Sequence, residues 1–71
     1  MSEKFDEFSN LVDSILENQQ TQQLRRGQLL FNTLWDFDKE AAEVLRGTDD
    51  DPFYDDSKIV RFWTYLENRW Q

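Results

Sequence analysis

Residues 36–57 read DFDKEAAEVLRGTDDDPFYDDS, and this stretch decides how the chain is divided into helices. Either Asp36 or Asp38 can accept a hydrogen bond from the first backbone N–H groups of a helix that we expect over Lys39–Arg46. Gly47 is suited to end that helix, because glycine readily adopts the left-handed conformation that follows many last helical turns. The expected apolar stripe of this short helix is Ala41, Val44 and Leu45, with Phe37 packing at its start.

The second half of the stretch predicts an acidic loop followed by another helix. Pro52 favours an extended conformation at Asp51 and prevents a helix from continuing through the loop. Asp55, Asp56 and Ser57 can then cap the last helix. An EF-hand calcium loop would need glycine at its sixth position and glutamate at its twelfth, and no register of this loop supplies both. We therefore interpret these acids as helix caps and solvated loop residues, with no metal site.

Apolar residues recur at helical spacing in the rest of the chain, which favours three longer helices. The first is expected over Ser2–Glu17, and the second over Thr21–Trp35 after a break near Asn18–Thr21. Gly27 lies on the apolar arc of the second helix, so we expect another segment to pack closely against it. Leu29 lies off that arc and is expected to be exposed or to touch a second chain. The apolar arcs are Phe5, Phe8, Leu11, Val12, Ile15 and Leu16; Leu24, Leu30, Phe31, Leu34 and Trp35; and Ile59, Phe62, Trp63, Leu66 and Trp70.

These patterns predict an all-α fold. No stretch alternates with a period of two for long enough to indicate a sheet. We expect a small bundle of three main helices plus one short helix, with the acidic loop before the last helix, as a single helical domain over residues 1–71. With no cysteine, the chain must be held together by apolar burial, to which its 15% aromatic residues contribute.

The composition also narrows the classes of function. Without cysteine or histidine, the chain lacks the commonest general base, thiol nucleophile and transition-metal ligands. Two glycines are too few for a glycine-rich phosphate loop. We therefore expect no enzyme, no cofactor and no bound metal. The start of the chain does not resemble a secretory signal, and no apolar run approaches the roughly 20 residues of a membrane span, so we expect a cytoplasmic protein with no membrane contact.

The charge is concentrated in the quoted stretch. Residues 36–57 carry nine acids and two bases, which equals the net charge of −7 for the whole chain. A concentrated negative field repels nucleic acid and attracts basic surfaces. We therefore expect a protein partner with a basic surface and no direct nucleic-acid binding.

Seven residues are the candidates for contact with that partner. They combine the acids of the loop with the aromatic residues expected to be only partly buried, because exposed aromatics are common at binding surfaces. Phe53 and Tyr54 could equally pack the loop onto the bundle. Arg26 either serves solubility or ties the acidic loop down through a charge-assisted pair. The candidate residues are Asp49, Asp50, Asp51, Phe53, Tyr54, Tyr65 and Trp70.

Three motifs carry a resemblance to known sequences. They are GQ-x-x-FN over residues 27–32, RGTD-x-DPFYDDS over residues 46–57, and an aromatic helix that ends in Trp70. On these motifs the stretch from Gln28 to Trp70 resembles a set of short proteins carried by phages or prophages. The resemblance implies a mobile-element origin, and it assigns no activity and no functional residues.

The sequence therefore favours a small non-enzymatic protein-interaction module that binds through the acidic segment and nearby aromatics. Self-association into a homodimer would add buried surface to a chain this small. The alternative is a nucleic-acid mimic that inhibits a DNA-binding host protein, with carboxylates in place of phosphates. Mimics spread their acids over much of a surface, whereas these acids lie in one segment, so the mimic ranks second.

Overall fold

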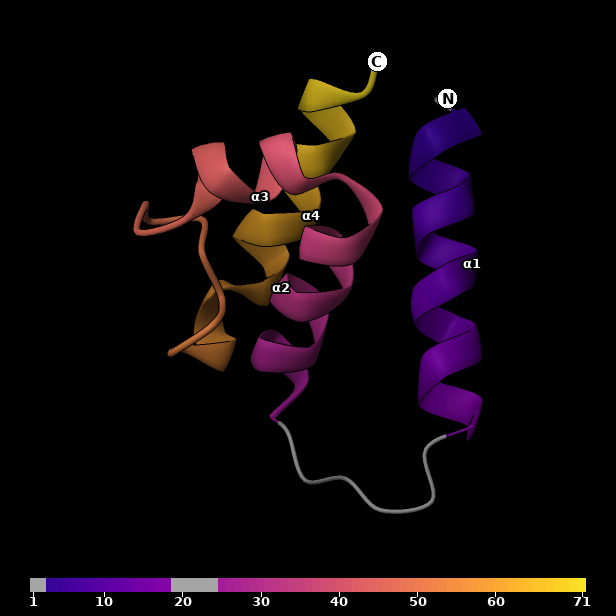
Figure 1. Cartoon of the computed structure of the whole chain (residues 1–71). Helices are drawn as coiled ribbons and strands as arrows, with labels where there is room; N and C mark the ends of the chain where they lie inside the picture. Colours follow the sequence, from indigo (N-terminus) through magenta and orange to yellow (C-terminus); the bar gives the residue numbers. More distant parts are fainter. Residues whose placement is uncertain (1–2, 19–24) are drawn as a thin grey trace.

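The computed structural model describes residues 3–18 and 25–71, and every regular element in these two ranges is helical (Figure 1). The predicted all-α bundle, with three longer helices, one short helix and the acidic loop before the last helix, is confirmed. Two of the expected helix starts, Ser2 and Thr21, lie outside the described residues. The expected break near Asn18–Thr21 lies mostly outside them as well. The elements are α1 (Glu3–Asn18), α2 (Arg26–Phe37), α3 (Lys39–Leu45), the 3-10 turn η1 (Asp56–Lys58) and α4 (Ile59–Arg69).

Helix α1 attaches to the bundle through one aromatic side chain above all. Phe8 is fully buried, and its ring centroid lies 5.5 Å from that of Trp63 and 5.6 Å from that of Trp70. Burying a side chain of this size contributes about 1.5–3 kcal/mol. Leu11, expected on the apolar arc, is instead 37% exposed at the edge of the packed face. Among the described residues, no helix has both the length and the apolar character needed to cross a membrane.

Helix α2 is covered on more than one side. It contacts α1, α3 and η1, and Figure 1 shows it between α1 and the loop that leads to η1. The expected exposure of Leu29 is therefore wrong: this side chain is 4% exposed. A single apolar arc describes a helix at the surface of a bundle, whereas a helix with neighbours on several sides buries a wider sector. The helix also starts later than expected, since Arg25 has an extended backbone with φ −65° and ψ 156°.

Helix α3 packs on α2 through two alanines. Asp38 caps it by accepting a hydrogen bond from the Ala41 backbone N–H at 3.2 Å, which confirms one of the two expected caps. Ala41 and Ala42 are both fully buried, and their small side chains allow the two helices to approach closely. Val44, expected on the buried stripe, is 54% exposed, so that part of the prediction is wrong.

The end of α4 lies beside the start of α1 (Figure 1). Trp70, which we expected to be partly exposed at a terminus, is 7% exposed and packs against Phe8 and Phe37. The ammonium group of Lys4 on α1 lies 5.3 Å from the centre of the Trp70 ring. The position of Trp70 in the sequence did not indicate that α1 would cover it. The core consists of Phe8, Val12, Leu30, Phe31, Leu34, Ala41, Ala42, Leu45, Phe62, Leu66 and Trp70.

Candidate functional site

The acidic loop begins with the turn that ends α3. Gly47 has a φ of 78°, a left-handed conformation that residues with a side chain rarely adopt, so glycine is required here. The Thr48 backbone N–H and hydroxyl both donate to the Leu45 carbonyl oxygen, at 3.0 and 2.6 Å. The predicted glycine stop of the short helix is confirmed.

The Asp51 side chain connects the start of the loop with its middle. One of its carboxylate oxygens accepts a hydrogen bond from the Gly47 backbone N–H, and the other accepts one from the Phe53 backbone N–H, both at 2.9 Å. Hydrogen bonds from backbone N–H groups to a carboxylate are among the stronger ones in proteins. Asp51 is therefore a structural residue of the loop.

The loop is clamped to the start of α2. The Gly27 backbone N–H donates to the Asp56 carboxylate at 3.0 Å, and a Cβ atom at Gly27 would overlap the Pro52 carbonyl oxygen. The expectation that a segment packs closely against Gly27 is confirmed, and that segment is the loop. Pro52 itself is fully buried.

A second clamp comes from Arg25. Its guanidinium donates to the Phe53 carbonyl oxygen, and to the Tyr54 carbonyl oxygen at 3.3 Å. An arginine does tie the loop to the second helix, but it is Arg25 and not Arg26, and it binds carbonyl oxygens and not carboxylates. Arg25 directly precedes α2 and has an extended backbone, so helical spacing does not indicate the direction of its side chain.

Four aromatic side chains form a continuous row, the aromatic row, that connects α2 with the loop. Successive ring centroids along Trp35, Phe31, Phe53 and Tyr54 are 6.2, 5.6 and 4.7 Å apart. Phe31 is buried, Trp35 and Phe53 are half-buried, and Tyr54 is 82% exposed. The docking of Phe53 on the bundle is confirmed, while Tyr54 projects into solvent.

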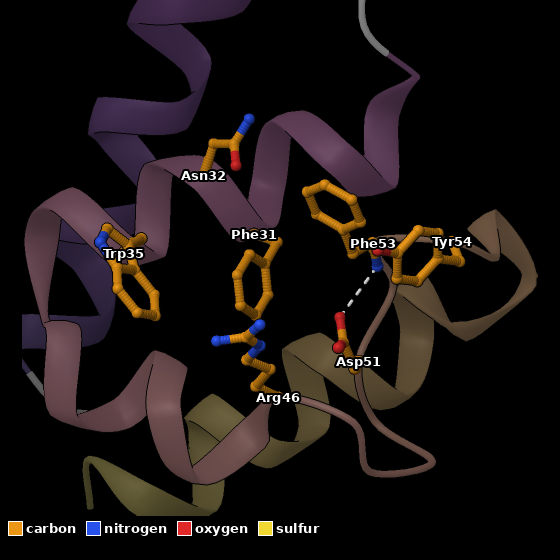
Figure 2. A pocket seen from close by; sticks show the side chains of 7 residues that line it. All are labelled: Phe31, Asn32, Trp35, Arg46, Asp51, Phe53 and Tyr54. Atoms are coloured by element: carbon orange, nitrogen blue, oxygen red, sulfur yellow. Dashed lines mark hydrogen bonds between the residues drawn. The ribbon is translucent and has the colours of Figure 1, made fainter.

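The aromatic row forms the wall of a pocket of about 300 Å³. Figure 2 shows Arg46 pointing toward the Phe31 ring, between Trp35 and Phe53. The lining residues are Phe31, Asn32, Trp35, Arg46, Asp51, Phe53 and Tyr54.

The structure brings only part of the predicted contact set together at this pocket. Asp51, Phe53 and Tyr54 line it. Asp49 is exposed on the loop, and Asp50 pairs with Arg61 on α4 at 3.2 Å. Neither of these two acids lines the pocket.

The other two predicted contact residues lie in the bundle. Tyr65 is half-buried, and its hydroxyl donates to the Ala41 carbonyl oxygen at 3.4 Å, which ties α4 to α3. Trp70 is part of the core and is unsuited to contact a partner.

The remaining loop acids serve the helix that follows. Asp55 caps η1, accepting hydrogen bonds from the Ser57 hydroxyl at 2.6 Å and from the Ser57 backbone N–H at 2.9 Å. The hydroxyl first, and then the backbone N–H, lower the pKa of Asp55 below its ordinary value of 3.8. In residues 3–18 and 25–71, no three acidic side chains are grouped so that they could hold a metal ion. The predicted capping role of Asp55 is confirmed.

Four pocket residues were not singled out from the sequence as contact residues: Phe31, Asn32, Trp35 and Arg46. Phe31 and Trp35 are four positions apart on a helix, which places them on one face, but this spacing predicted core packing for both. Nothing in the sequence signals that Arg46 and the later loop share a pocket, because that depends on where the loop folds back.

No family model matches the chain, and neither a curated protein nor a solved structure matches it significantly. The fold and the site define a small all-α bundle whose acidic loop is clamped to α2 and borders an aromatic pocket. These features of the chain itself are the basis for a proposed function.

Proposed function

We propose that the chain is a small non-enzymatic protein-interaction module that binds a partner with a basic surface through the acidic loop. The observation that carries the proposal is Tyr54, which is 82% exposed on a loop that is anchored on both sides. Exposed tyrosines supply large contact areas at low entropic cost and are enriched where proteins bind one another.

The anchoring of the loop is what makes Tyr54 suited to binding. Its neighbour Phe53 is packed on Phe31, Arg25 holds the carbonyl oxygens of both residues 53 and 54, and Asp51 ties the loop to Gly47. A loop that is already ordered loses little conformational entropy on binding, so more of the contact energy remains as affinity.

The charge of the loop region supports a basic partner. Asp49 is exposed and makes no ion pair with another described residue, and the segment that contains it holds the whole net charge of −7. Complementary charge accelerates association more than it raises affinity. Asp51, Asp55 and Asp56 already accept backbone N–H groups, which leaves few loop carboxylates free to imitate phosphates. The interaction module is therefore favoured over the nucleic-acid mimic.

The proposal can be tested by site-specific photo-crosslinking. A photoreactive phenylalanine analogue is placed at Tyr54 in one variant and at Val60 in a control, because Val60 is 74% exposed but lies on α4. We expect a protein adduct from the Tyr54 position that is absent from the Val60 position and that weakens as salt is raised. Equal adducts from both positions, or none from Tyr54, would contradict the proposal.

A variant that removes one charge tests electrostatic attraction of the partner without disturbing the folded loop. Asp49→Asn removes one exposed charge without touching the backbone contacts of the loop, and it should slow association with the crosslinked partner and reduce its salt dependence. Asp51 is left unchanged in this test, because its carboxylate holds the loop in place. Unchanged kinetics in Asp49→Asn would assign the interface to Tyr54 alone.

A further inference from the structure

Arg46 is an exposed residue that lines the pocket, and its guanidinium makes no ion pair with another described residue. Each of the three ion pairs among the described residues uses a different base: Lys4, Arg61 or Arg69. The backbone N–H of Arg46 donates to the Ala42 carbonyl oxygen at 2.9 Å and closes the last turn of α3, but within residues 3–18 and 25–71 no atom accepts a hydrogen bond from its guanidinium. The side chain is therefore free to bind a ligand.

Asp51 lines the same pocket but does not neutralise Arg46. Its two oxygens accept the Gly47 and Phe53 backbone N–H groups, and the ion pairs among the described residues do not include one between Asp51 and Arg46. Two N–H donors stabilise the negative charge of Asp51 and hold its carboxylate in the loop, but they do not remove that charge. The pocket therefore carries one acid whose oxygens are in use and one base, Arg46, whose guanidinium N–H groups are not used by a described residue.

The rest of the pocket is suited to a flat apolar group. Phe31, Trp35 and Phe53 provide ring faces and edges on its wall, and the ammonium group of Lys39 lies 5.3 Å from the centre of the Trp35 ring. Ligand pockets begin at about 300 Å³, and an aromatic ring with a short acidic arm is suited to that size.

We propose that this pocket binds a small aromatic carboxylic acid. The planar guanidinium of Arg46 can hold a carboxylate through two parallel hydrogen bonds, and the ring of the ligand stacks against the aromatic row. The inference goes beyond the protein partner proposed above and does not rest on it, since the ligand is a small molecule and uses Arg46 and Trp35 in place of the acids.

The proposal can be tested by NMR titration of the isotope-labelled chain with 3-phenylpropionate at physiological salt. The Debye length is then about 8 Å, which screens the repulsion between the anion and the acidic protein. The matched probe is 3-phenylpropionamide, which keeps the ring and the shape but has no charge. We expect shifts confined to the amides around the pocket and roughly tenfold tighter binding of the acid than of the amide, as is typical of a charged hydrogen bond.

Two glutamine variants identify the residue responsible. Arg46→Gln should bind acid and amide equally, while Arg26→Gln, the same change at an exposed arginine on α2 that does not line the pocket, should keep the preference. If Arg46→Gln does not fold, Arg46→Lys replaces it and must bind the acid more weakly than the parent, because an ammonium group lacks the planar fork. Equal binding of acid and amide by the parent, no shifts at the pocket, or an unchanged preference without Arg46 would overturn the proposal.

Discussion

At the scale of single residues, Gly27 shows why an unfavourable residue is used. Glycine costs about 1 kcal/mol in a helix relative to alanine, yet the loop lies so close that a Cβ atom would overlap the Pro52 carbonyl oxygen. Pro52 is buried and the loop is held by Asp56, so the backbone there has little freedom to move away. Close approach of the loop outweighs helix propensity at this position.

Gly27→Ala should therefore destabilise the fold by about 1–3 kcal/mol, the usual cost of overpacking. The free energy of unfolding can be measured by urea denaturation. Asn32→Ala is the control, because Asn32 is exposed on the same helix and alanine should there be neutral or slightly stabilising. A Gly27→Ala variant more stable than the parent would show that the loop is not held against α2.

Asp51 and Asp49 differ in role although they are two positions apart. Asp51→Asn replaces one acceptor oxygen by an NH₂ group that faces a backbone N–H, and it should cost about 1–2 kcal/mol of stability. Asp49→Asn makes the same change in charge at an exposed site and should stay within about 0.5 kcal/mol of the parent. Thermal denaturation of both variants compares them directly. Equal effects would mean that charge, and not the backbone contacts, sets the stability of the loop.

At the scale of elements, Asp38 joins three helices. It lies between α2 and α3, caps α3 through the Ala41 N–H, and accepts a hydrogen bond from Lys4 on α1 at 2.7 Å. The Lys4 hydrogen bond, more than the other contacts, holds the pKa of Asp38 below its ordinary value of 3.8. The ionised form is therefore the one that the fold stabilises.

The pH dependence follows from the sign of that shift. Because the pKa of Asp38 is lower in the folded chain, its contribution is complete above 3.8, decreases as the pH falls below that value, and is lost once the pH passes the folded pKa. Asp38→Asn should thus be less stable than the parent at neutral pH and lose less stability on acidification. Lys4→Gln removes the main cause of the lowered pKa of Asp38, so the free energy of unfolding of this variant should also depend less on pH in the acidic range. Urea denaturation across this pH range measures both, and an Asp38→Asn profile as steep as that of the parent would exclude this role.

At the scale of the whole molecule, α1, α2 and the α4 region share one aromatic core. Trp63 and Trp70 of the α4 region pack against Phe8 of α1, and Trp70 also packs against Phe37 at the end of α2. Removing one helix would expose the aromatic side chains that it covers on the others. The chain should therefore fold as one unit.

We expect thermal unfolding to be two-state and independent of added chelator. Far-UV circular dichroism follows the helices and tryptophan fluorescence follows the core, so the two signals should share one midpoint. A fluorescence transition at lower temperature than the loss of helix would show that α1 separates first. A midpoint lowered by chelator would reveal a stabilising metal.

The sequence by itself determined the helices, the glycine stop at Gly47, and small sets of candidate caps that include Asp38 and Asp55. These features depend on residues close together in the chain, through backbone hydrogen bonds, allowed dihedral angles and helical spacing. The fold class could be predicted for this reason. The glycine on the apolar arc at Gly27 also predicted close packing there, but the segment that supplies it, the loop at Pro52, is distant in the sequence.

Only the tertiary structure decided which surfaces remained free. Leu29 and Trp70 are buried because other segments reach them from distant parts of the sequence, and Val44 is exposed because none does. The pocket exists because the loop returns to α2 and places Phe53 beside Phe31, while Arg46 forms no ion pair with another residue that the structure describes. Contacts of this kind depend on long-range packing, which the local spacing of residues does not encode.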